Sequence, residues 1–508
     1  MPKFHSTLSR RDFMKGLGVI GAGLGVASAT APIFHDVDEM SSSSSVAEKR
    51  PWWIKERDYL DMTTEVDWNM KKRFNNWSYS NFMAHLTEEH AIQRLKASDD
   101  LARENVLNKK PGYDLRDFMA SSSGWSVVHA LGNITFSADA LAAADMPPGQ
   151  VPPIVRYLLL ATNKTMDVPR WEGTPEENAS MIRSIVRMAG GSTVGFGKLD
   201  EQTKKLVWEA EFNPPGLPEK RIFFEDVDKP YETDSKKVIP NKCTNVITTV
   251  IREESGLQRY APNGMNAFYV HKAYSQTAIT SVRINTFLRG LGYTSCASGP
   301  AYNIPNVAWG VATGLGELNR MKSMTTPEVG PMIRNTLVFF TDLPLPTTNP
   351  IDAGMNRFCY DCKKCATACP SGALRMQREP TWDIVSADDN AGNPDHLRPE
   401  LFNSPGHKSW FCNHFACSDF WVQSSLDGCG ICVASCVFSK LPASSVHEVV
   451  KGVVAQTPVF NGFFYNMDKA FGYNTFAGYN VETGSTNVSD FWDNPDKWLP
   501  LSKSGNSY

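Results

Sequence analysis

The cysteines of this 508-residue chain are concentrated in one stretch. Nine of the eleven lie between Cys359 and Cys436, and only Cys243 and Cys296 fall elsewhere. Disulfides that stabilise a fold would be spread through it, so this clustering indicates metal binding. The first run is Cys359-x2-Cys362-x2-Cys365-x3-Cys369-Pro370. This is the spacing of a bacterial ferredoxin, in which three thiolates hold one [4Fe–4S] cluster and the fourth reaches a second cluster.

A second run, Cys429-x2-Cys432-x3-Cys436, lacks both a nearby first cysteine and the following proline. Its missing ligand must come from upstream, either from Cys417 or from Cys412. We favour Cys417, because it is nearer and because residues 417–426 could fold back as one helix. The ferredoxin crossover rule then predicts two ligand sets. These are Cys359, Cys362, Cys365 and Cys436 for one cluster, and Cys369, Cys417, Cys429 and Cys432 for the other.

Zinc is the alternative metal, since zinc sites also use C-x2-C pairs. The x2-x2-x3-Pro spacing favours iron–sulfur clusters. Two adjacent clusters form a path for electrons, which implies a donor at one end and an acceptor at the other.

The N-terminus carries a twin-arginine export signal, Ser9-Arg10-Arg11-Asp12-Phe13-Met14-Lys15, followed by an uncharged Gly- and Ala-rich stretch. Ala27-Ser28-Ala29 is a candidate cleavage site, which makes residues 1–29 the signal peptide and 30–50 a Ser-rich linker. Because this route carries folded proteins, it suits a protein whose cofactors are inserted before export.

Charge and hydropathy exclude two broad classes of protein. The net charge is −3, so there is no basic field that would attract nucleic acid. Outside the N-terminus we find no run of 18 apolar residues, which excludes a polytopic membrane protein.

Four further segments follow the linker. Residues 51–150 form an N-terminal helical region, with helical spacing over 80–107. Within residues 151–345, the sequence at 151–160 predicts a buried strand or a short helix. A helix is predicted over 176–188, with Thr174 as N-cap and Gly190-Gly191 as its stop, and another over 273–291. Strands are predicted at 222–224, 246–251 and 336–341, a loop at 300–316, and a linker at 342–350. This alternation indicates an α/β or α+β core. Residues 346–445 hold the cysteines, and 446–508 are expected to pack on the core.

Several motifs along the chain resemble the cobamide-dependent reductive dehalogenases of organohalide-respiring bacteria, and the N-terminus looks most like the catalytic subunits of Dehalococcoides-type organisms. They include the export signal, both cysteine runs, and these segments: Phe287-Leu288-Arg289-Gly290-Leu291-Gly292-Tyr293, Gly314-Leu315-Gly316-Glu317, Thr326-Pro327-Glu328-Val329-Gly330, Arg334, and Thr341-Asp342-Leu343-Pro344-Leu345.

The resemblance implies an α+β fold, with a nitroreductase-like cobamide-binding core fused to a ferredoxin-like domain with two [4Fe–4S] clusters. The Asp-x-His-x-x-Gly motif that donates a histidine to cobalt elsewhere is absent. This agrees with the family, whose cobamide is bound base-off without a protein ligand and is reduced to Co(I). The implied reaction is R–Cl + 2e⁻ + H⁺ → R–H + Cl⁻.

The family's proposed proton donor is a tyrosine, helped by an arginine and an asparagine. The matching positions here are Tyr274 for the donor, Arg334 for the cation and Asn303 for the third group. Tyr274 would lie at the start of the predicted helix, and Tyr302 and Tyr293 are alternatives to it. A phenol with a pKa of about 10 is a weak acid at neutral pH, so a neighbouring cation is needed to stabilise the phenolate.

The remaining aromatic, histidine and cysteine residues have ordinary interpretations. Trp410, Phe411, Phe415, Phe420 and Trp421 are expected in the core. His407 and His414 are expected at the surface or behind the ligands rather than on cobalt. Cys243 and Cys296 are expected to be inert or merely near the cofactor.

The resemblance also implies partners and a location. A small integral-membrane anchor protein would hold the enzyme peripherally on the outer face of the cytoplasmic membrane, next to a membrane electron donor. The substrate is a halogenated organic compound, with chlorinated ethenes ahead of aromatics and alkanes. Two alternatives remain: an exported ferredoxin-type electron-transfer subunit without a cobamide of its own, and a cytosolic reductase acting on a tRNA base. The export signal and the lack of a basic face disfavour the second.

Overall fold

The structure is a computed structural model. It describes residues 50–76, 88–131, 168–211, 218–253, 258–298, 306–384, 403–424, 429–439, 445–470 and 492. The signal peptide, nearly all of the Ser-rich linker and the segment expected at 151–160 lie outside the described residues.

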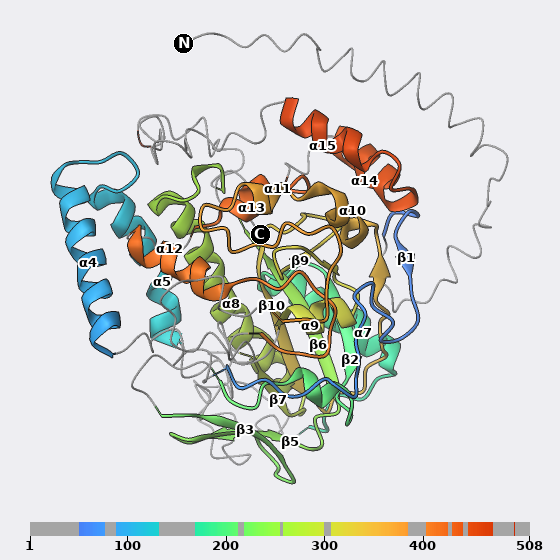
Figure 1. The fold of residues 1–508 in the computed structure, drawn as a ribbon. Helices are drawn as coiled ribbons and strands as arrows, with labels where there is room; N and C mark the ends of the chain where they lie inside the picture. The colour runs from blue at the N-terminus through green and yellow to red at the C-terminus, as the bar shows by residue number, and fades with distance from the viewer. Residues whose placement is uncertain are drawn as a thin grey trace.

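A four-stranded antiparallel sheet forms the centre of the fold (Figure 1). Its strand order is β2 (Val194–Lys198), β6 (Asn245–Arg252), β10 (Ile333–Thr341) and β7 (Ser295–Ala297). The strands predicted at 246–251 and 336–341 are confirmed, and β10 begins three residues earlier than expected. Because every pairing in this sheet is antiparallel, the core is of the α+β type rather than α/β.

Helices cover both faces of this sheet. On one face, α7 (Pro175–Ala189) and α8 (Gly264–Gly290) pack on side chains such as Phe196, Ile247 and Phe339. On the other, α9 (Asn306–Ala312) packs through Trp309 on Val338 and Phe340. Alternate residues of β10 therefore serve opposite cores, as the period of two in a strand requires.

Local signals specify α7 as predicted. Thr174 accepts a hydrogen bond from the Glu177 amide at 3.2 Å, and Glu177 accepts one from the Thr174 amide at 2.8 Å. This capping box, with Pro175 in the first turn, fixes the start of the helix. Gly190 ends it with a φ of 106°, in the left-handed region that glycine favours.

Two sequence predictions in the core need correction. Helix α8 begins at Gly264, nine residues before the predicted start at 273. Its first turns are buried, packing against α5 (Leu115–Leu131) and the rest of the core, so they lack a polar face that would show helical periodicity. The loop expected at 300–316 contains α9, and the 342–350 linker is packed, with Thr348 hydrogen-bonded to Phe196 of β2.

Smaller elements surround the core. The predicted strand at 222–224 lies in β3 (Arg221–Glu225), which joins β5 (Lys236–Pro240) and β4 (Tyr231–Glu232) in a three-stranded sheet. Short pairs join β1 (Lys55–Glu56) to β11 (Ile351–Asp352) and β8 (Glu317–Leu318) to β9 (Met324–Thr325). Helix α4 (Glu88–Leu107) lies within the helical spacing predicted over 80–107. Two 3₁₀ turns are η3 (Thr203–Leu206) and η4 (Gln258–Tyr260).

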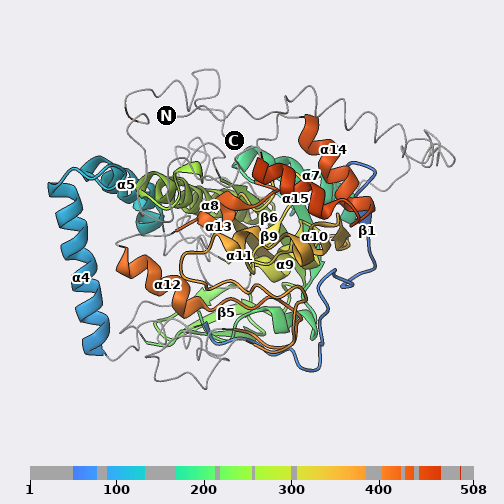
Figure 2. The same cartoon turned by 45° about the horizontal axis from the view of Figure 1, so that its top comes forward.

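The cysteine region is a set of short helices. They are α10 (Met355–Cys362), α11 (Lys364–Thr367), α12 (His414–Gln423) and α13 (Ile431–Ser435). The C-terminal helices α14 (Ser445–Gln456) and α15 (Asn461–Ala470) pack on α10 rather than on the central sheet (Figure 2). A buried ion pair between Lys364 and Asp468 joins α15 to the first cysteine run. Within the described residues, no helix is long and apolar enough to cross a membrane.

Candidate functional site

The thiols gather in two groups that mix the two cysteine runs. Cys359, Cys362 and Cys365 lie beside Cys436, which comes from the second run. Burial is the main cause that raises the pKa of Cys359 to about 12, and the Cys436 thiol is the next. The Cys436 thiol also contributes to the raised pKa values of Cys362 and Cys365. We name these four residues the first thiol group.

The second thiol group consists of Cys369, Cys417, Cys429 and Cys432. Burial again raises the pKa of Cys429, to about 12, and Cys417 and Cys369 are the neighbouring thiols that add to this rise. The same two thiols contribute to the raised pKa of Cys432. The sequence spacing predicted these neighbours, including the exchange of Cys369 and Cys436 between the runs. The structure thus brings together each of the two sets predicted as ligands.

Cys412, the alternative to Cys417, lies beside it and packs in the same buried cluster as Cys369, Cys417 and Cys432. Its thiol is hydrogen-bonded to Cys417, and this contact is the largest cause that raises the pKa of Cys417. Cys417 lies on α12, so the helix that was expected to fold back from this residue begins at His414 instead.

Matching turns position the two C-x2-C pairs. Lys363, between Cys362 and Cys365, has a φ of 52°, and Gly430, between Cys429 and Cys432, has a φ of 68°. Each left-handed residue starts a short helix, α11 or α13, and these two helices pack together. At Gly430 a Cβ would lie 2.6 Å from the side-chain oxygen of Asn266, so only glycine fits there.

Within the described part of the chain, no group of three or more His, Cys, Asp or Glu side chains is placed to hold a single metal ion. A zinc site requires four ligands to converge at about 2.0–2.3 Å.

Tyr274, which is buried, and Arg334, which is half-buried, form a pair, as the resemblance implied. Arg334 Nη2 donates a hydrogen bond to the Tyr274 hydroxyl at 2.7 Å, and the guanidinium carbon lies 4.8 Å from the centre of the phenol ring. Tyr274 is only 6% exposed. It lies near the middle of α8 and not at the helix start, because α8 begins at Gly264.

A β-bulge directs Arg334 toward Tyr274. Opposite β6, Ile333 pairs with Arg252 and Asn335 with Ile251, so Arg334 is an extra residue in β10. In a regular strand, Arg334 would share the face of Val338 and Phe340, which pack toward α9. The extra residue reverses the alternation and brings Arg334 to the α8 face.

Two further ionisable residues surround this pair. Burial raises the pKa of Glu253 to about 7, and the charge of Arg334 opposes that rise. Burial also raises the pKa of Tyr269 well above its usual value, with smaller effects from Glu253, Arg334, Cys432 and Cys429. Tyr269 therefore lies between the Tyr274–Arg334 pair and the second thiol group.

The other candidates of the sequence stand apart from this pair. The Tyr293 hydroxyl donates to the Trp171 carbonyl at 2.7 Å, and its ring packs in the core with Leu288. It therefore serves a structural role. Asn303 and Tyr302 lie outside the described residues.

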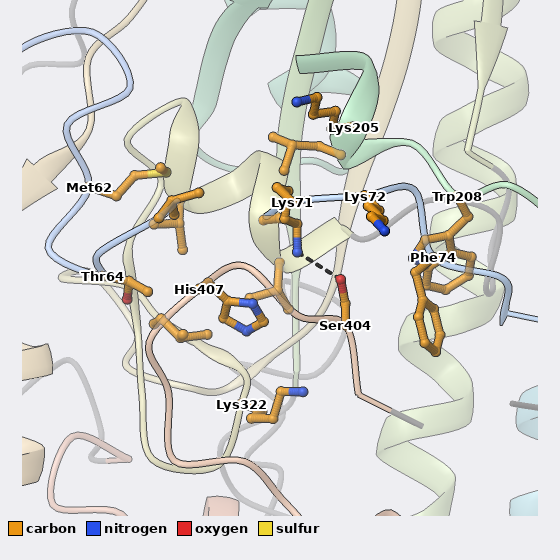
Figure 3. A pocket seen from close by; sticks show the side chains of 16 residues that line it. Met62, Thr64, Lys71, Lys72, Phe74, Lys205, Trp208, Lys322, Ser404 and His407 are labelled. Atoms are coloured by element: carbon orange, nitrogen blue, oxygen red, sulfur yellow. Dashed lines mark hydrogen bonds between the residues drawn. The ribbon is translucent and has the colours of Figure 1, made fainter. Parts of the chain in front are cut away.

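A cavity of about 180 Å³ opens on the α9 side of the core (Figure 3). Its walls are largely apolar, with Phe74, Trp208 and Val311 among them, and they also carry four lysines and a histidine. These are Lys71, Lys72, Lys205, Lys322 and His407. No acidic residue occurs among the described residues that line it.

Two lysines of this cavity, Lys71 and Lys322, are destabilised as cations. Burial and the nearby Lys322 lower the pKa of Lys71 to about 7. Burial lowers the pKa of Lys322 to about 8. Lys71 donates to the Ser404 hydroxyl at 2.8 Å and Lys322 to the Asn403 side chain at 2.6 Å, both neutral acceptors. An anion in the cavity would stabilise both ammonium groups.

The aromatic, histidine and isolated cysteine residues differ in how deeply they are buried. Trp410 and Phe411 are fully buried, as expected of core residues. His407 and His414 are half-buried rather than at the surface, and burial lowers the pKa of His414 to about 3. Cys243 and Cys296 are fully buried in the core on the α9 face of the sheet.

The comparisons with known proteins identify the family of this chain. Residues 49–345 match the family model described as "Reductive dehalogenase subunit". The chloroethene reductive dehalogenase of Dehalococcoides mccartyi is 31% identical over 93% of this chain and 95% of its own length. The chain belongs to the reductive dehalogenase family. It is an oxidoreductase that acts on carbon–halogen bonds, which excludes the alternative of an electron-transfer subunit without catalysis of its own.

Further relatives of this reductive dehalogenase agree. The trichloroethene reductive dehalogenase of another Dehalococcoides mccartyi strain is 30% identical over 93% of this chain and 95% of its own length. A solved reductive dehalogenase structure, described for B12-dependent dehalogenation, shares the fold with a TM-score of 0.54 and 16% identity. That match covers 88% of this chain and 53% of the solved chain, so our chain spans about half the length of the solved protein.

Sequence reasoning missed several residues near these sites. Lys71, Lys322 and Glu253 gave no signal, because each is an isolated charged residue whose neighbours come from distant parts of the chain. Arg320, which donates to the Cys359 carbonyl, was also missed. Only Arg320 had a hint, since it follows the family motif that ends at Glu317.

Proposed function

We propose that this enzyme removes chlorine from chlorinated ethenes, by R–Cl + 2e⁻ + H⁺ → R–H + Cl⁻, with electrons from two [4Fe–4S] clusters and the halogen handled by a base-off corrinoid. The observation that carries the proposal is the hydrogen bond between Arg334 and Tyr274, close to the second thiol group. A proton source and an electron path meet there. The names of the two Dehalococcoides relatives support a chlorinated ethene as the substrate.

The proton comes from the Tyr274 hydroxyl. After it leaves, the Arg334 guanidinium, already 2.7 Å from that oxygen, stabilises the phenolate. Tyr274 is buried and Arg334 is half-buried, so water screens this attraction less than it would at the surface. Asn303 is the third group proposed to orient the substrate.

The two thiol groups are the proposed cluster ligands. Cys359, Cys362, Cys365 and Cys436 hold one cluster, and Cys369, Cys417, Cys429 and Cys432 hold the other. The grouping of the thiols around the paired turns at Lys363 and Gly430 supports this assignment. Residues 346–445 then form a ferredoxin-like module beside a nitroreductase-like core at 151–345.

The lysine-lined cavity fits part of a corrinoid. When bound, a corrinoid supplies a cobalt centre that can accept two electrons and react with the carbon–halogen bond. A cobamide also carries a phosphodiester in its nucleotide tail. Lys71 and Lys322 would hold that anion, and the apolar walls would hold the uncharged part of the tail.

The location follows from the export signal at Arg10-Arg11. We place the enzyme on the outer face of the cytoplasmic membrane, attached peripherally through a small integral-membrane anchor protein. That anchor brings it to the membrane electron donor.

The proposed function is tested by metal analysis together with turnover. The anaerobically purified enzyme is expected to contain about eight iron atoms and about one cobalt atom. With a reduced one-electron donor, it is expected to release chloride from chlorinated ethenes faster than from chlorinated aromatics or alkanes. Iron without cobalt, after growth with ample corrinoid, would contradict the corrinoid. Faster turnover of an aromatic would contradict the substrate assignment.

The role of the cavity gives a separate prediction. Lys71→Gln is expected to weaken uptake of cobalamin at least about tenfold during reconstitution, because one of the two buried cations facing the phosphodiester is lost. Uptake of cobinamide, which lacks the nucleotide tail, is expected to stay unchanged. Bound corrinoid per chain, read from its absorption spectrum, is the measurement.

A matched control keeps this prediction specific. Lys408→Gln removes a half-buried lysine of the same region, whose partner is Glu65 and which does not line the cavity, and should change neither uptake. If Lys71→Gln weakens cobinamide and cobalamin equally, the cavity does not recognise the tail.

A further inference from the structure

Arg320 is a buried cation held entirely by neutral acceptors. It lies between β8 and β9 and is 1% exposed. Its Nε and Nη2 donate to the Cys359 carbonyl at 3.2 and 2.6 Å. Its Nη1 donates to the carbonyls of Arg375 and Gln377, each at 2.7 Å. The guanidinium carbon also lies 4.6 Å from the centre of a Trp410 ring.

Most of the ionisable groups that act on this cation are cysteines, which bind a cluster as thiolates. Burial lowers the pKa of Arg320, and the groups that oppose this are, in order, Cys359, Cys365, Cys362 and Asp361. Three of the four belong to the first thiol group. Asp361 forms its own ion pair with Arg378 at 2.9 Å, so its charge is already compensated.

A fixed positive charge beside the first thiol group raises the electron affinity of a cluster bound there. Reduction adds one negative charge to a [4Fe–4S] cluster, and a nearby buried cation stabilises that added charge more strongly than it would in water. Hydrogen bonds hold the guanidinium in place, so it cannot move away as the charge changes.

We propose that Arg320 raises the reduction potential of the cluster held by Cys359, Cys362, Cys365 and Cys436, and so makes it the cluster that first accepts an electron from the donor. This inference rests on the ligand sets proposed above. It fits the layout, because Tyr269, which is affected by the charge of Arg334, is also affected by Cys432 and Cys429 of the second thiol group. The first thiol group is then the outer end of the path, and the second delivers electrons to the reaction.

The test is a redox titration of the full-length, cofactor-loaded enzyme, followed by the electron paramagnetic resonance of its reduced clusters. Arg320→Gln is expected to lower the midpoint potential of one cluster signal and to leave the other unchanged. Arg378→Gln is the comparison variant, because it removes an exposed arginine of the same region that pairs with Asp361 and Glu379. Solvent screens charges at this exposed site, so we expect a smaller shift than in Arg320→Gln. Arg320→Gln with full iron content and two unshifted midpoints would overturn the proposal.

Arg320→Lys provides a second test if the glutamine variant does not assemble its clusters. A buried lysine loses its charge as the pH rises, whereas arginine stays charged. The midpoint potential of one cluster in Arg320→Lys should therefore fall with rising pH more steeply than in the wild type. Equal pH dependence would count against a role for the charge. Wild-type protein without iron would instead refute the proposed ligands, so the two failures are distinguishable.

Discussion

Tyr274→Phe is expected to lower the rate of dehalogenation by about 10²- to 10⁴-fold, the usual contribution of a positioned general acid. The substitution removes the hydroxyl that Arg334 holds at 2.7 Å and keeps the ring. Iron and corrinoid contents should be unchanged, because neither cofactor depends on this oxygen for its ligands. Chloride release under single-turnover conditions, with pre-reduced enzyme, measures the chemical step directly.

Tyr293→Phe is the matched control for Tyr274→Phe. It also removes one buried phenol oxygen, but that oxygen donates to the Trp171 carbonyl within the core. We expect a loss of about 1 kcal/mol in stability and an unchanged rate of chloride release. If Tyr293→Phe slowed the reaction and Tyr274→Phe did not, the assignment of the donor would be wrong.

Arg334 shows why the sequence could suggest the catalytic pair but could not establish its geometry. The family motif upstream of Arg334 selected the residue. Its orientation depends on one extra residue in β10, opposite Ile251, that no periodicity reveals. A regular strand would turn the guanidinium toward α9, away from Tyr274. The bulge is a property of the pairing with β6, and pairing is a tertiary contact.

Local signals, in contrast, were sufficient for other elements. The capping box at Thr174 and the left-handed Gly190 set both ends of α7, because each interaction joins residues within a few positions in the chain. The early start of α8 had no such signal. Its first turns are buried against other helices and carry apolar residues on several sides, so their periodicity is weak.

The charged sites were the hardest to predict. The cavity joins Lys71, Lys322 and His407, which come from widely separated parts of the chain. Arg320 likewise reaches the carbonyls of Cys359 and Gln377 from a different segment. A lone lysine or arginine is usually a solvated surface residue, so only burial in the folded chain marks these as exceptions.

Cysteine spacing was the strongest sequence signal, and it leads to the sharpest remaining test. Cys417→Ala is expected to reduce the iron content from about eight to about four atoms per chain and to abolish turnover, because a [4Fe–4S] cluster needs four thiolates. Cys412→Ala is the matched control, since Cys412 lies beside Cys417 and is equally a cysteine of this segment. It should keep about eight iron atoms and most of its activity.

The physical reason for this contrast is the position of Cys417 relative to the second run. The Cys417 and Cys369 thiols lie outside that run and contribute to the raised pKa values of Cys429 and Cys432. The Cys412 thiol is instead hydrogen-bonded to Cys417. Iron and sulfide analysis, with the resonance signals of the reduced clusters, distinguishes the two variants. Loss of a cluster in Cys412→Ala, together with a full iron content in Cys417→Ala, would exchange their roles. Loss in both would mean that the hydrogen bond between the two thiols is itself required to place the ligand.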